Sequence, residues 1–424
     1  MGMHQDTKSP YFLNAKEFII RLCNSYGSNI VVVGLNVNAW RLKISANKRS
    51  ILIDFQGSIN AYTGVPLTVK NDAVCFARAG FNVILWINNA AEIPNIDNWI
   101  REESRLPKNY KFEFDCSRPK NWVLWLKQLF QVSIRFKQST FFYCDLFPGL
   151  RINNSTLRIV RVHDPFSNSV SATKSFLENP ARIKLRAAKF LRVIAFNRIK
   201  HDSYLVFNSK FTKKRFCAIH GDGKGSIVIY PTIQFKFSPN SSFNIENQNN
   251  PYWIMIGGQR QRKKPSDIIN LWAMSSISSI SDFVVVGEVP LTLLCVEAIE
   301  KYKAGALRFV KNIPKDELQS YISNSAASIF YSLGEGFGLP IAESLACGKT
   351  VICNDLDVFT EVTNGLSLTF PTSNPAVVLQ IMESVLARGP ESLEEASALK
   401  KQASNYSIES VSARWASFLK DLTP

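Results

Sequence analysis

The residues best suited to chemistry lie in a glycine-rich loop and the segment that follows it, residues 334–343. Three glycines fall within its first five positions, and Glu335 and Glu343 are eight residues apart. Glycines let backbone N–H groups approach a ligand, and Pro340 suits the first turn of a helix whose exposed N–H groups attract phosphate. A carboxylate can accept two hydrogen bonds from a vicinal diol. The pattern predicts a bound sugar nucleotide, with one glutamate on a sugar ring and the other on a ribose.

A basic segment nearer the N-terminus supplies the cations that such a ligand requires. Residues 257–265 follow an apolar strand and open a helix, so their side chains emerge at the carboxyl end of that strand. Cleavage of a glycosyl–phosphate bond leaves a diphosphate whose growing negative charge must be met by cations, oriented N–H groups or a metal. Arg262 and Lys263 are the predicted cations. Taken alone, the charges and the glutamate spacing would also fit solvated residues at helix starts.

Together these segments resemble the GT-B glycosyltransferases of the family 4, or group 1, type. Residues 335–348 reproduce the family signature E-G-F-G-L-P-x-x-E-x-x-A-x-G almost letter for letter. Members have two Rossmann-like domains that face a cleft, and they transfer a sugar from a nucleotide donor with retention at the anomeric carbon, generally without a metal. The resemblance implies that Glu335 binds the donor sugar and Glu343 the ribose. The donor-site residues between them are Gly336, Phe337, Gly338 and Leu339.

Two further segments resemble elements of the same family. Residues 257–264 match G-G-x-x-x-R-K-N, which places Arg262 and Lys263 on the diphosphate and leaves Lys264 in the position of the usual Asn. His163 ends an apolar strand and begins an H-D pair, which the family often has near the reacting sugar. The resemblance therefore implies that His163, Glu335, Arg262 and Lys263 form the catalytic set. A lone histidine at such a position is also often structural.

Weaker matches complete the donor site. Gly64, in a T-G pair, matches the loop that approaches the donor phosphates or the acceptor, although a plain turn would look the same. Val310 ends a strand where family members bind the nucleotide base through the backbone. Residues 207–212 resemble the family's serine-containing strand exit. Residues 355–357 copy a metal-binding D-x-D motif, but we expect no metal because cations and a helix terminus already meet the phosphate charge.

Length and composition set the broad class. A chain of 424 residues with 46% hydrophobic residues predicts two domains with separate cores. The longest apolar stretches fall far below the roughly 18 residues that span a bilayer, and the N-terminus lacks a secretion-signal pattern. We therefore expect a cytoplasmic protein. Eight cysteines without a C-x-x-C pair predict reduced thiols, with neither disulfides nor zinc.

Apolar strands alternate with helical segments in two series, which predicts α/β domains with parallel sheets covered on both faces. Ligands bind such sheets at the carboxyl ends of the strands. An Asn/Ser-rich stretch separates the series and reads as a linker. The predicted parts are an extension (1–50), an acceptor domain (51–236), a linker (237–250), a nucleotide-sugar domain (251–407) and a C-terminal helix (408–424) that crosses back to the first domain.

Charge is unevenly distributed along the chain. The net charge is +16, with +19 in residues 1–250 and −3 in residues 251–424. The first half therefore suits an anionic partner, for which nucleic acid, anionic lipid and a phosphate-bearing acceptor are candidates. Residues 179–201 contain seven Lys/Arg and no acid, and residues 122–130 contain an aromatic stripe, so both suit an anionic membrane surface. A core stripe beside a solvated basic face is the alternative.

These observations converge on a retaining, metal-independent glycosyltransferase. Its predicted substrates are a UDP-, GDP- or dTDP-sugar and a glycan or lipid-linked acceptor, as in bacterial surface polysaccharide synthesis, with possible contact to the inner membrane face. The rival hypotheses are an inactive GT-B assembly subunit and a GT-B sugar-nucleotide epimerase. A nucleic-acid-binding protein is the other class, but no recognised RNA or DNA module accompanies the positive charge. The donor sugar, base, acceptor and linkage stay open.

Overall fold

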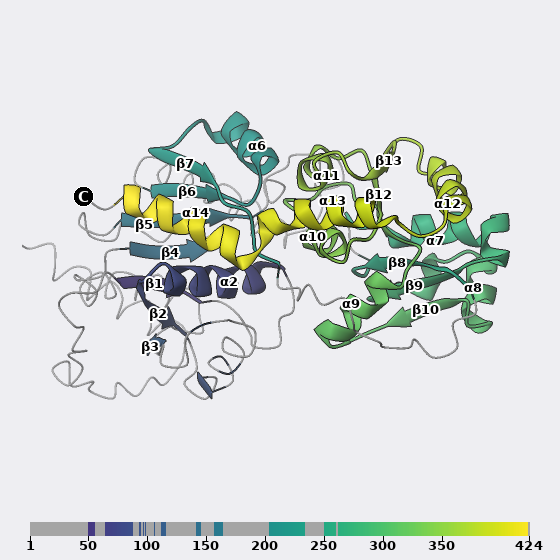
Figure 1. Ribbon diagram of the computed structural model, residues 1–424, viewed down its shortest axis with the longest axis horizontal. Helices are drawn as coiled ribbons and strands as arrows, with labels where there is room; N and C mark the ends of the chain where they lie inside the picture. Colours follow the sequence, from purple (N-terminus) through teal and green to yellow (C-terminus); the bar gives the residue numbers. More distant parts are fainter. Residues whose placement is uncertain are drawn as a thin grey trace, which may run out of the picture. The chain divides into compact units, whose positions relative to one another are not determined.

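Two parallel β-sheets with packed helices make up the described part of the chain (Figure 1). The computed structural model describes residues 50–55, 64–87, 93–94, 96, 98, 106, 112–115, 141–145, 157–163, 203–233, 250–259 and 262–422. All of them belong to one compact unit, Arg49–Pro424. The predicted 1–50 extension (except Ser50), the linker (except Asn250) and the basic 179–201 segment lie outside these residues.

The first sheet has the strand order β3-β2-β1-β4-β5-β6-β7, and all its pairings are parallel. Strands β1 and β2 are largely apolar and almost wholly buried, as expected for a sheet covered on both faces. The strands are β1 (Ser50–Asp54), β2 (Asn82–Trp86), β3 (Glu113–Asp115), β4 (Phe141–Asp145), β5 (Leu157–Val162), β6 (Ser203–Phe207) and β7 (Gly225–Val228), and the helices of this part are α2 (Gly64–Arg78) and α6 (Lys210–His220).

The second sheet has the order β10-β9-β8-β11-β12-β13, again wholly parallel. Its strands are β8 (Tyr252–Ile256), β9 (Asp282–Val286), β10 (Leu307–Val310), β11 (Ala327–Phe330), β12 (Val351–Asn354) and β13 (Leu368–Phe370). Its α-helices are α7 (Pro265–Ala273), α8 (Val296–Lys303), α9 (Lys315–Ser323), α10 (Leu339–Ala346), α11 (Asp357–Thr363), α12 (Val377–Arg388) and α13 (Leu393–Ala403). The order reverses between β8 and β11, which is where doubly wound sheets bind ligands.

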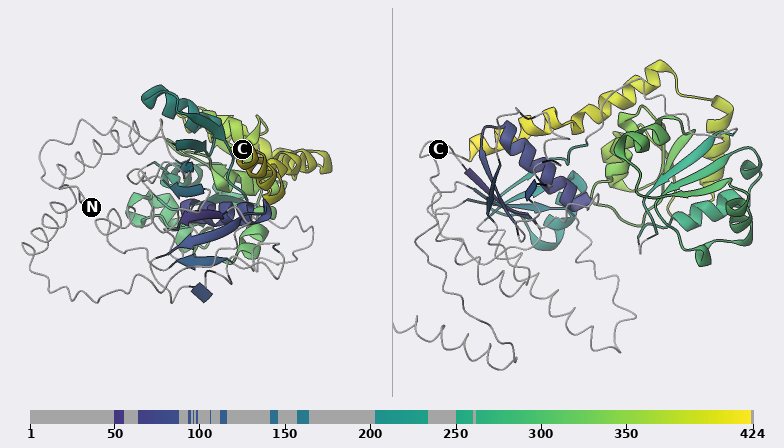
Figure 2. Two further views of the ribbon diagram at one scale, coloured as in Figure 1. Left: turned by 90° about the vertical axis from the view of Figure 1, so that its left-hand side faces the viewer. Right: turned by 90° about the horizontal axis from the view of Figure 1, so that it is seen from below.

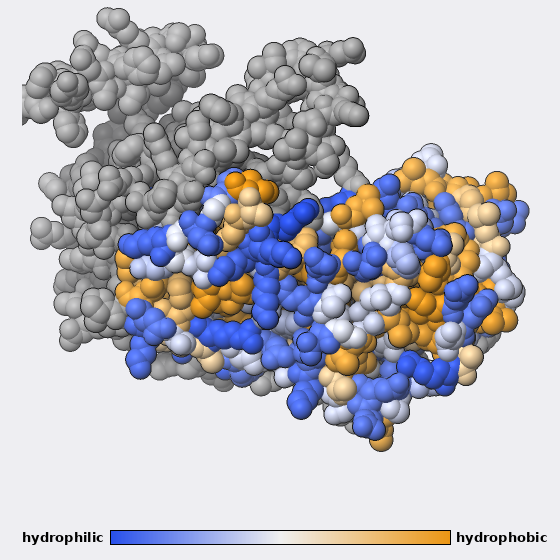
Figure 3. Space-filling view, turned by 90° about the horizontal axis from the view of Figure 1, so that it is seen from above, coloured by the Kyte–Doolittle hydropathy of each residue, from blue (hydrophilic) through white to orange (hydrophobic). Residues whose placement is uncertain are grey.

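These sheets confirm the predicted α/β class. Strands of both predicted series are present among the described residues. The short strand β3 was not predicted, because three residues of sequence Glu-Phe-Asp carry no periodic signal. Among the described helices, none is both long and apolar enough to cross a membrane. Hydrophilic and hydrophobic areas are interspersed over the described surface in Figure 3.

The C-terminal helix α14 (Ile408–Asp421) lies beside α2 and packs into the core of the first sheet (Figures 1 and 2). Trp415 is fully buried there, with its ring 4.7 Å from that of Phe76. The indole Nε1–H of Trp415 donates to Asp72 at 3.0 Å, and the carboxylate of Asp72 lies 3.6 Å from Arg161. A buried carboxylate needs such donors, so α14 completes the polar as well as the apolar interior of this domain.

Candidate active site

The candidate site is built on two loops that leave the carboxyl ends of β8 and β11, the neighbouring strands at the switch point of the second sheet. An antiparallel bridge joins Lys263 to Ser332, and Leu333 N donates to Arg262 O at 2.8 Å. The amide of Asn354, on β12, donates to the carbonyl of Ser332 at 2.9 Å. These bonds fix the basic segment against the glycine-rich loop.

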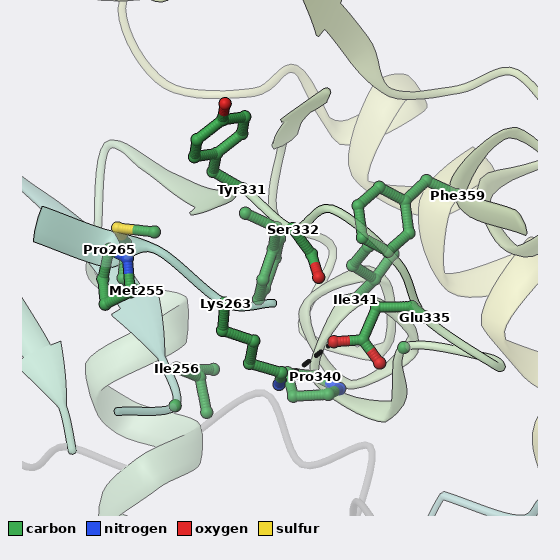
Figure 4. A pocket seen from close by; sticks show the side chains of 13 residues that line it. Met255, Ile256, Lys263, Pro265, Tyr331, Ser332, Glu335, Pro340, Ile341 and Phe359 are labelled. Atoms are coloured by element: carbon green, nitrogen blue, oxygen red, sulfur yellow. Dashed lines mark ion pairs between the residues drawn. The ribbon is translucent and has the colours of Figure 1, made fainter. Parts of the chain in front are cut away.

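Lys263 and Glu335 face each other in the lining of a pocket (Figure 4). Lys263 Nζ lies 3.5 Å from Glu335 Oε1, and Glu335 is only 9% exposed. The pocket is otherwise largely apolar; its lining also includes Met255, Ile256, Gly257, Pro265, Phe330, Tyr331, Ser332, Gly338, Pro340, Ile341 and Phe359. A partly buried cation beside an acceptor-only carboxylate can bind a diphosphate and a sugar hydroxyl side by side.

Helix α10 begins next to this pair. Its N-cap is Gly338, whose φ of 93° lies in the left-handed region that favours glycine. No side chain caps this helix terminus, so the first N–H groups of α10 are not satisfied by a capping side chain. Gly338 and Pro340 line the same pocket as Lys263. The helix therefore contributes the partial positive charge of its N-terminus to the place where the cation lies.

Glu343 is the fifth residue of α10 and is half-buried. Burial raises the pKa of Glu343 to about 7, although the positive charges of Lys315 and Lys263 oppose this shift. Lys263 therefore lies close enough to influence both glutamates of the predicted pair. A carboxylate with so high a pKa is poorly solvated, and hydroxyl donors from a ligand would stabilise its charged form.

The carboxyl ends of β8, β9 and β10 meet on the other side of the switch point. Gly287 N donates to Val310 O at 2.9 Å, and Gln259 N donates to Glu288 O at 2.9 Å. A Cβ on Gly258 would lie 2.7 Å from Glu288 O, so this backbone contact requires glycine. Val310 thus lies at the predicted edge of the sheet, but its carbonyl already accepts a bond from Gly287.

His163, from the first sheet, reaches the glycine-rich loop through its backbone. A Cβ on Gly336 would lie 2.0 Å from His163 O, and Asn208 Nδ2 donates to that same carbonyl at 2.6 Å. Burial, helped by the positive charge of Arg161, lowers the pKa of His163 to about 3. The imidazole is therefore neutral at physiological pH, and the end of β5 lies directly against the loop that carries Glu335.

The remaining predicted residues are placed less directly at the pocket. The ring of Phe337 is buried between Tyr230 and Tyr406, with centroids 5.8 and 5.2 Å away, so only its backbone is available to a ligand. Leu339 is the first residue of α10. Gly64 begins α2, but the loop before it, residues 56–63, lies outside the described residues.

Two hydroxyls, those of Ser209 and Thr212, donate to Gly336 O in the glycine-rich loop. The carboxylate of Glu361 accepts from the N-terminus of α6. The sequence did not predict a role for these three residues. The only available signal was that residues 207–212 resemble a family element.

No group of three or more His, Cys, Asp or Glu side chains that could hold a metal occurs among the residues that the structure describes. Asp355, from the D-x-D sequence, accepts a hydrogen bond from Thr372 N at 2.8 Å, which joins the segment after β12 to the segment after β13.

Comparisons with known proteins identify the fold and the domain. WaaG, a glycosyltransferase involved in lipopolysaccharide biosynthesis, is 13% identical and aligns over 87% of this chain and 99% of that chain with a TM-score of 0.63. Anabaena Alr3699/HepE, in complex with UDP and glucose, is 14% identical and aligns over 88% and 100% with a TM-score of 0.57. The fold is therefore GT-B, as predicted.

A family model described as "Glycosyl transferases group 1" matches residues 238–406. This segment, which carries Lys263, Glu335 and Glu343, is similar to the group 1 glycosyl transferases. The O-antigen chain mannosyltransferase RfbU of Salmonella typhimurium is 25% identical over 184 residues, or 42% of this chain and 48% of that protein. The chain spans less than half the length of the curated relatives it matches.

Proposed function

We propose that this protein is a retaining, metal-independent glycosyltransferase that moves a sugar from a nucleoside diphosphate to a hydroxyl of a glycan or lipid-linked acceptor. The observation that carries the proposal is the Lys263–Glu335 pair at the switch point of the second sheet, beside the N-terminus of α10. This arrangement combines a diphosphate-binding cation, a helix terminus and a diol-binding carboxylate within one pocket.

In this mechanism the leaving diphosphate receives its stabilisation from the protein. Lys263, Arg262 and the N-terminus of α10 stabilise the charge that develops as the glycosyl–phosphate bond breaks. Glu335 orients the donor sugar, and Glu343 binds the ribose. The acceptor hydroxyl attacks the face that the diphosphate leaves, and the departing phosphate takes its proton, so no protein nucleophile is required. His163 is neutral and serves as a hydrogen-bonding group near the reacting sugar.

Bacterial surface polysaccharide is the proposed setting. RfbU is named as an O-antigen chain mannosyltransferase and WaaG as an enzyme of lipopolysaccharide biosynthesis, which supports a glycan or lipid-linked acceptor and makes a mannosyl donor the first to test. In the first domain, α6 carries Lys210, Lys213, Lys214 and Arg215 and has no acid in its first turn. Its positive charge suits an anionic membrane surface, so we propose a cytoplasmic enzyme that binds peripherally to the inner face of the membrane.

A donor screen tests this proposal. Thermal unfolding is measured with a panel of UDP-, GDP- and dTDP-sugars, since a ligand that binds only the folded protein raises the unfolding temperature. The stabilising donor is then incubated with acceptors in the presence and absence of EDTA. The proposal predicts a glycoside whose anomeric configuration matches the donor and whose yield does not change with EDTA. Release of free sugar as the main product would instead identify an epimerase, and binding without turnover would identify an inactive subunit.

A further inference from the structure

The N-terminus of α6, in the first domain, is held by groups from the second domain. Ser209 is the N-cap of this helix, and its hydroxyl accepts from Thr212 N at 2.9 Å. The same hydroxyl donates to Gly336 O at 2.6 Å, and Thr212 Oγ1 donates to Gly336 O at 3.0 Å. The carbonyl of Gly336, the residue after Glu335, therefore receives two hydrogen bonds from the N-terminal end of α6.

Glu361, on α11, adds a second set of hydrogen bonds to the N-terminus of α6, in which the second domain is the acceptor. Its two carboxylate oxygens accept from Lys210 N at 2.7 Å and from Phe211 N at 2.9 Å, which are the first two N–H groups of α6. The first turn of α6 contains no acidic residue of its own. A helix N-terminus favours a negative charge, and here another domain supplies it.

The contact includes both chemically important segments of the site. Gly336 lies against the carbonyl of His163, which leaves no room for a side chain, and Asn208 donates to that same carbonyl. Residues 208–212 thus bond on one side to the end of β5 and to His163, which follows it, and on the other to the loop that carries Glu335. A rotation of the Gly336–Phe337 peptide, which carries Gly336 O, would break both hydroxyl bonds at once.

We propose that Ser209, Thr212 and Glu361, here called the α6 anchor, are positioning residues that hold the Glu335 loop in register with the first domain. The inference rests on the proposed glycosyl transfer. The α6 anchor contacts neither the pocket-lining cation nor Glu343, so its loss leaves donor binding largely intact and misplaces the donor sugar relative to the acceptor. The affected quantity is turnover, together with the fraction of donor that reacts with water.

The first test removes the hydroxyls. Thr212→Val deletes one bond to Gly336 O without touching the cap, and combination with Ser209→Ala deletes both. We expect kcat to fall about tenfold or more in the double variant, because small misplacements of reacting groups are costly, while the donor Kd changes by less than about threefold. In the double variant, hydrolysis of the donor should rise relative to transfer. The single variant Thr212→Ser keeps a hydroxyl at this position and should show the wild-type ratio of hydrolysis to transfer.

The matched control is Ser392→Ala. Ser392 also caps a helix, α13, by accepting from Glu395 N at 3.1 Å, but both residues lie in the second domain. The Ser392→Ala variant should lose the side-chain cap of α13 and keep the wild-type kcat. If Ser392→Ala lowers kcat as much as the double variant, or if the double variant keeps the wild-type kcat and hydrolysis ratio, the α6 anchor has no positioning role.

A second measurement does not depend on activity. Glu361→Gln weakens the charge at the N-terminus of α6, and Glu395→Gln does the same within α13, where Glu395 accepts from Ser392 N at 2.8 Å. Scanning calorimetry should show the two domains unfolding at more widely separated temperatures in Glu361→Gln than in wild type or Glu395→Gln. An identical separation between the two unfolding temperatures in all three proteins would contradict the proposed role of the α6 anchor. If the wild type transfers sugar from no donor, the proposed function fails, while the calorimetry still decides whether the anchor couples the domains.

Discussion

Replacement of Glu343 by glutamine should make the ligand-free protein more stable at pH 8 while it weakens donor binding. Burial raises the pKa of Glu343 from the usual 4.5 to about 7. In the folded state the carboxylate holds its proton at pH values where the unfolded chain has already released it. Between about pH 4.5 and 7 the native state therefore binds more protons than the unfolded state. The free energy of unfolding consequently falls as pH rises through this range. Glutamine does not titrate and escapes this loss.

The size of the effect follows from the shift. One pKa unit corresponds to about 1.4 kcal/mol, so the full shift would be worth about 3 kcal/mol, and the partial exposure of Glu343 makes this an upper bound. Urea unfolding of wild type and Glu343→Gln at pH 4.5 and pH 8 measures the difference. We expect similar midpoints at pH 4.5 and a higher midpoint for the variant at pH 8, with weaker donor protection. Glu383→Gln, on the exposed face of α12, is the control. A difference between wild type and Glu343→Gln that is the same at both pH values would refute the reasoning.

Three other predictions concern the packing around the site. Gly336→Ala places a Cβ 2.0 Å from the backbone oxygen of His163, so it should abolish transfer and lower the unfolding temperature; wild-type values for both would contradict the proposed packing. Trp415→Phe removes the donor to the buried Asp72 and should cost about 1–3 kcal/mol of unfolding free energy in denaturant titrations, whereas no change would mean that this bond contributes little. His163, with its pKa lowered to about 3, should show constant imidazole NMR shifts from pH 5 to 8, and a midpoint near 6.5 would disprove its burial. Because the unfolded chain binds a proton near pH 6.5, His163 should also reduce stability as pH falls from about 6.5 toward 3.

Much of the fold was readable because most of its strands are short, largely apolar runs. The strand order could not be derived from these runs, and the resemblance of residues 335–348 to a known signature implied only the GT-B fold. The Lys263 and Glu335 pair was predictable for the same reason, since both follow strands whose carboxyl ends share one edge of a sheet.

Contacts between distant parts of the chain were not readable. Nothing local indicates that Gly336 packs on His163 or that Glu361 caps α6, because these contacts join segments that are far apart in sequence. Phe337 was predicted at the donor site from its place in the signature, and the structure places its ring in the core between Tyr230 and Tyr406. Sequence position alone cannot separate a side chain that binds a ligand from one that supports the loop.

The central claim is that Lys263 stabilises the departing diphosphate beside Glu335. The most direct measurement is the rate of nucleoside diphosphate release coupled to glycoside formation, compared between wild type and Lys263→Met with the donor identified by thermal protection. We expect one diphosphate released per glycoside in the wild type and a loss of about 10²- to 10³-fold in turnover in Lys263→Met, with the fold intact. A Lys263→Met protein that releases diphosphate and forms glycoside at the wild-type rate would contradict it.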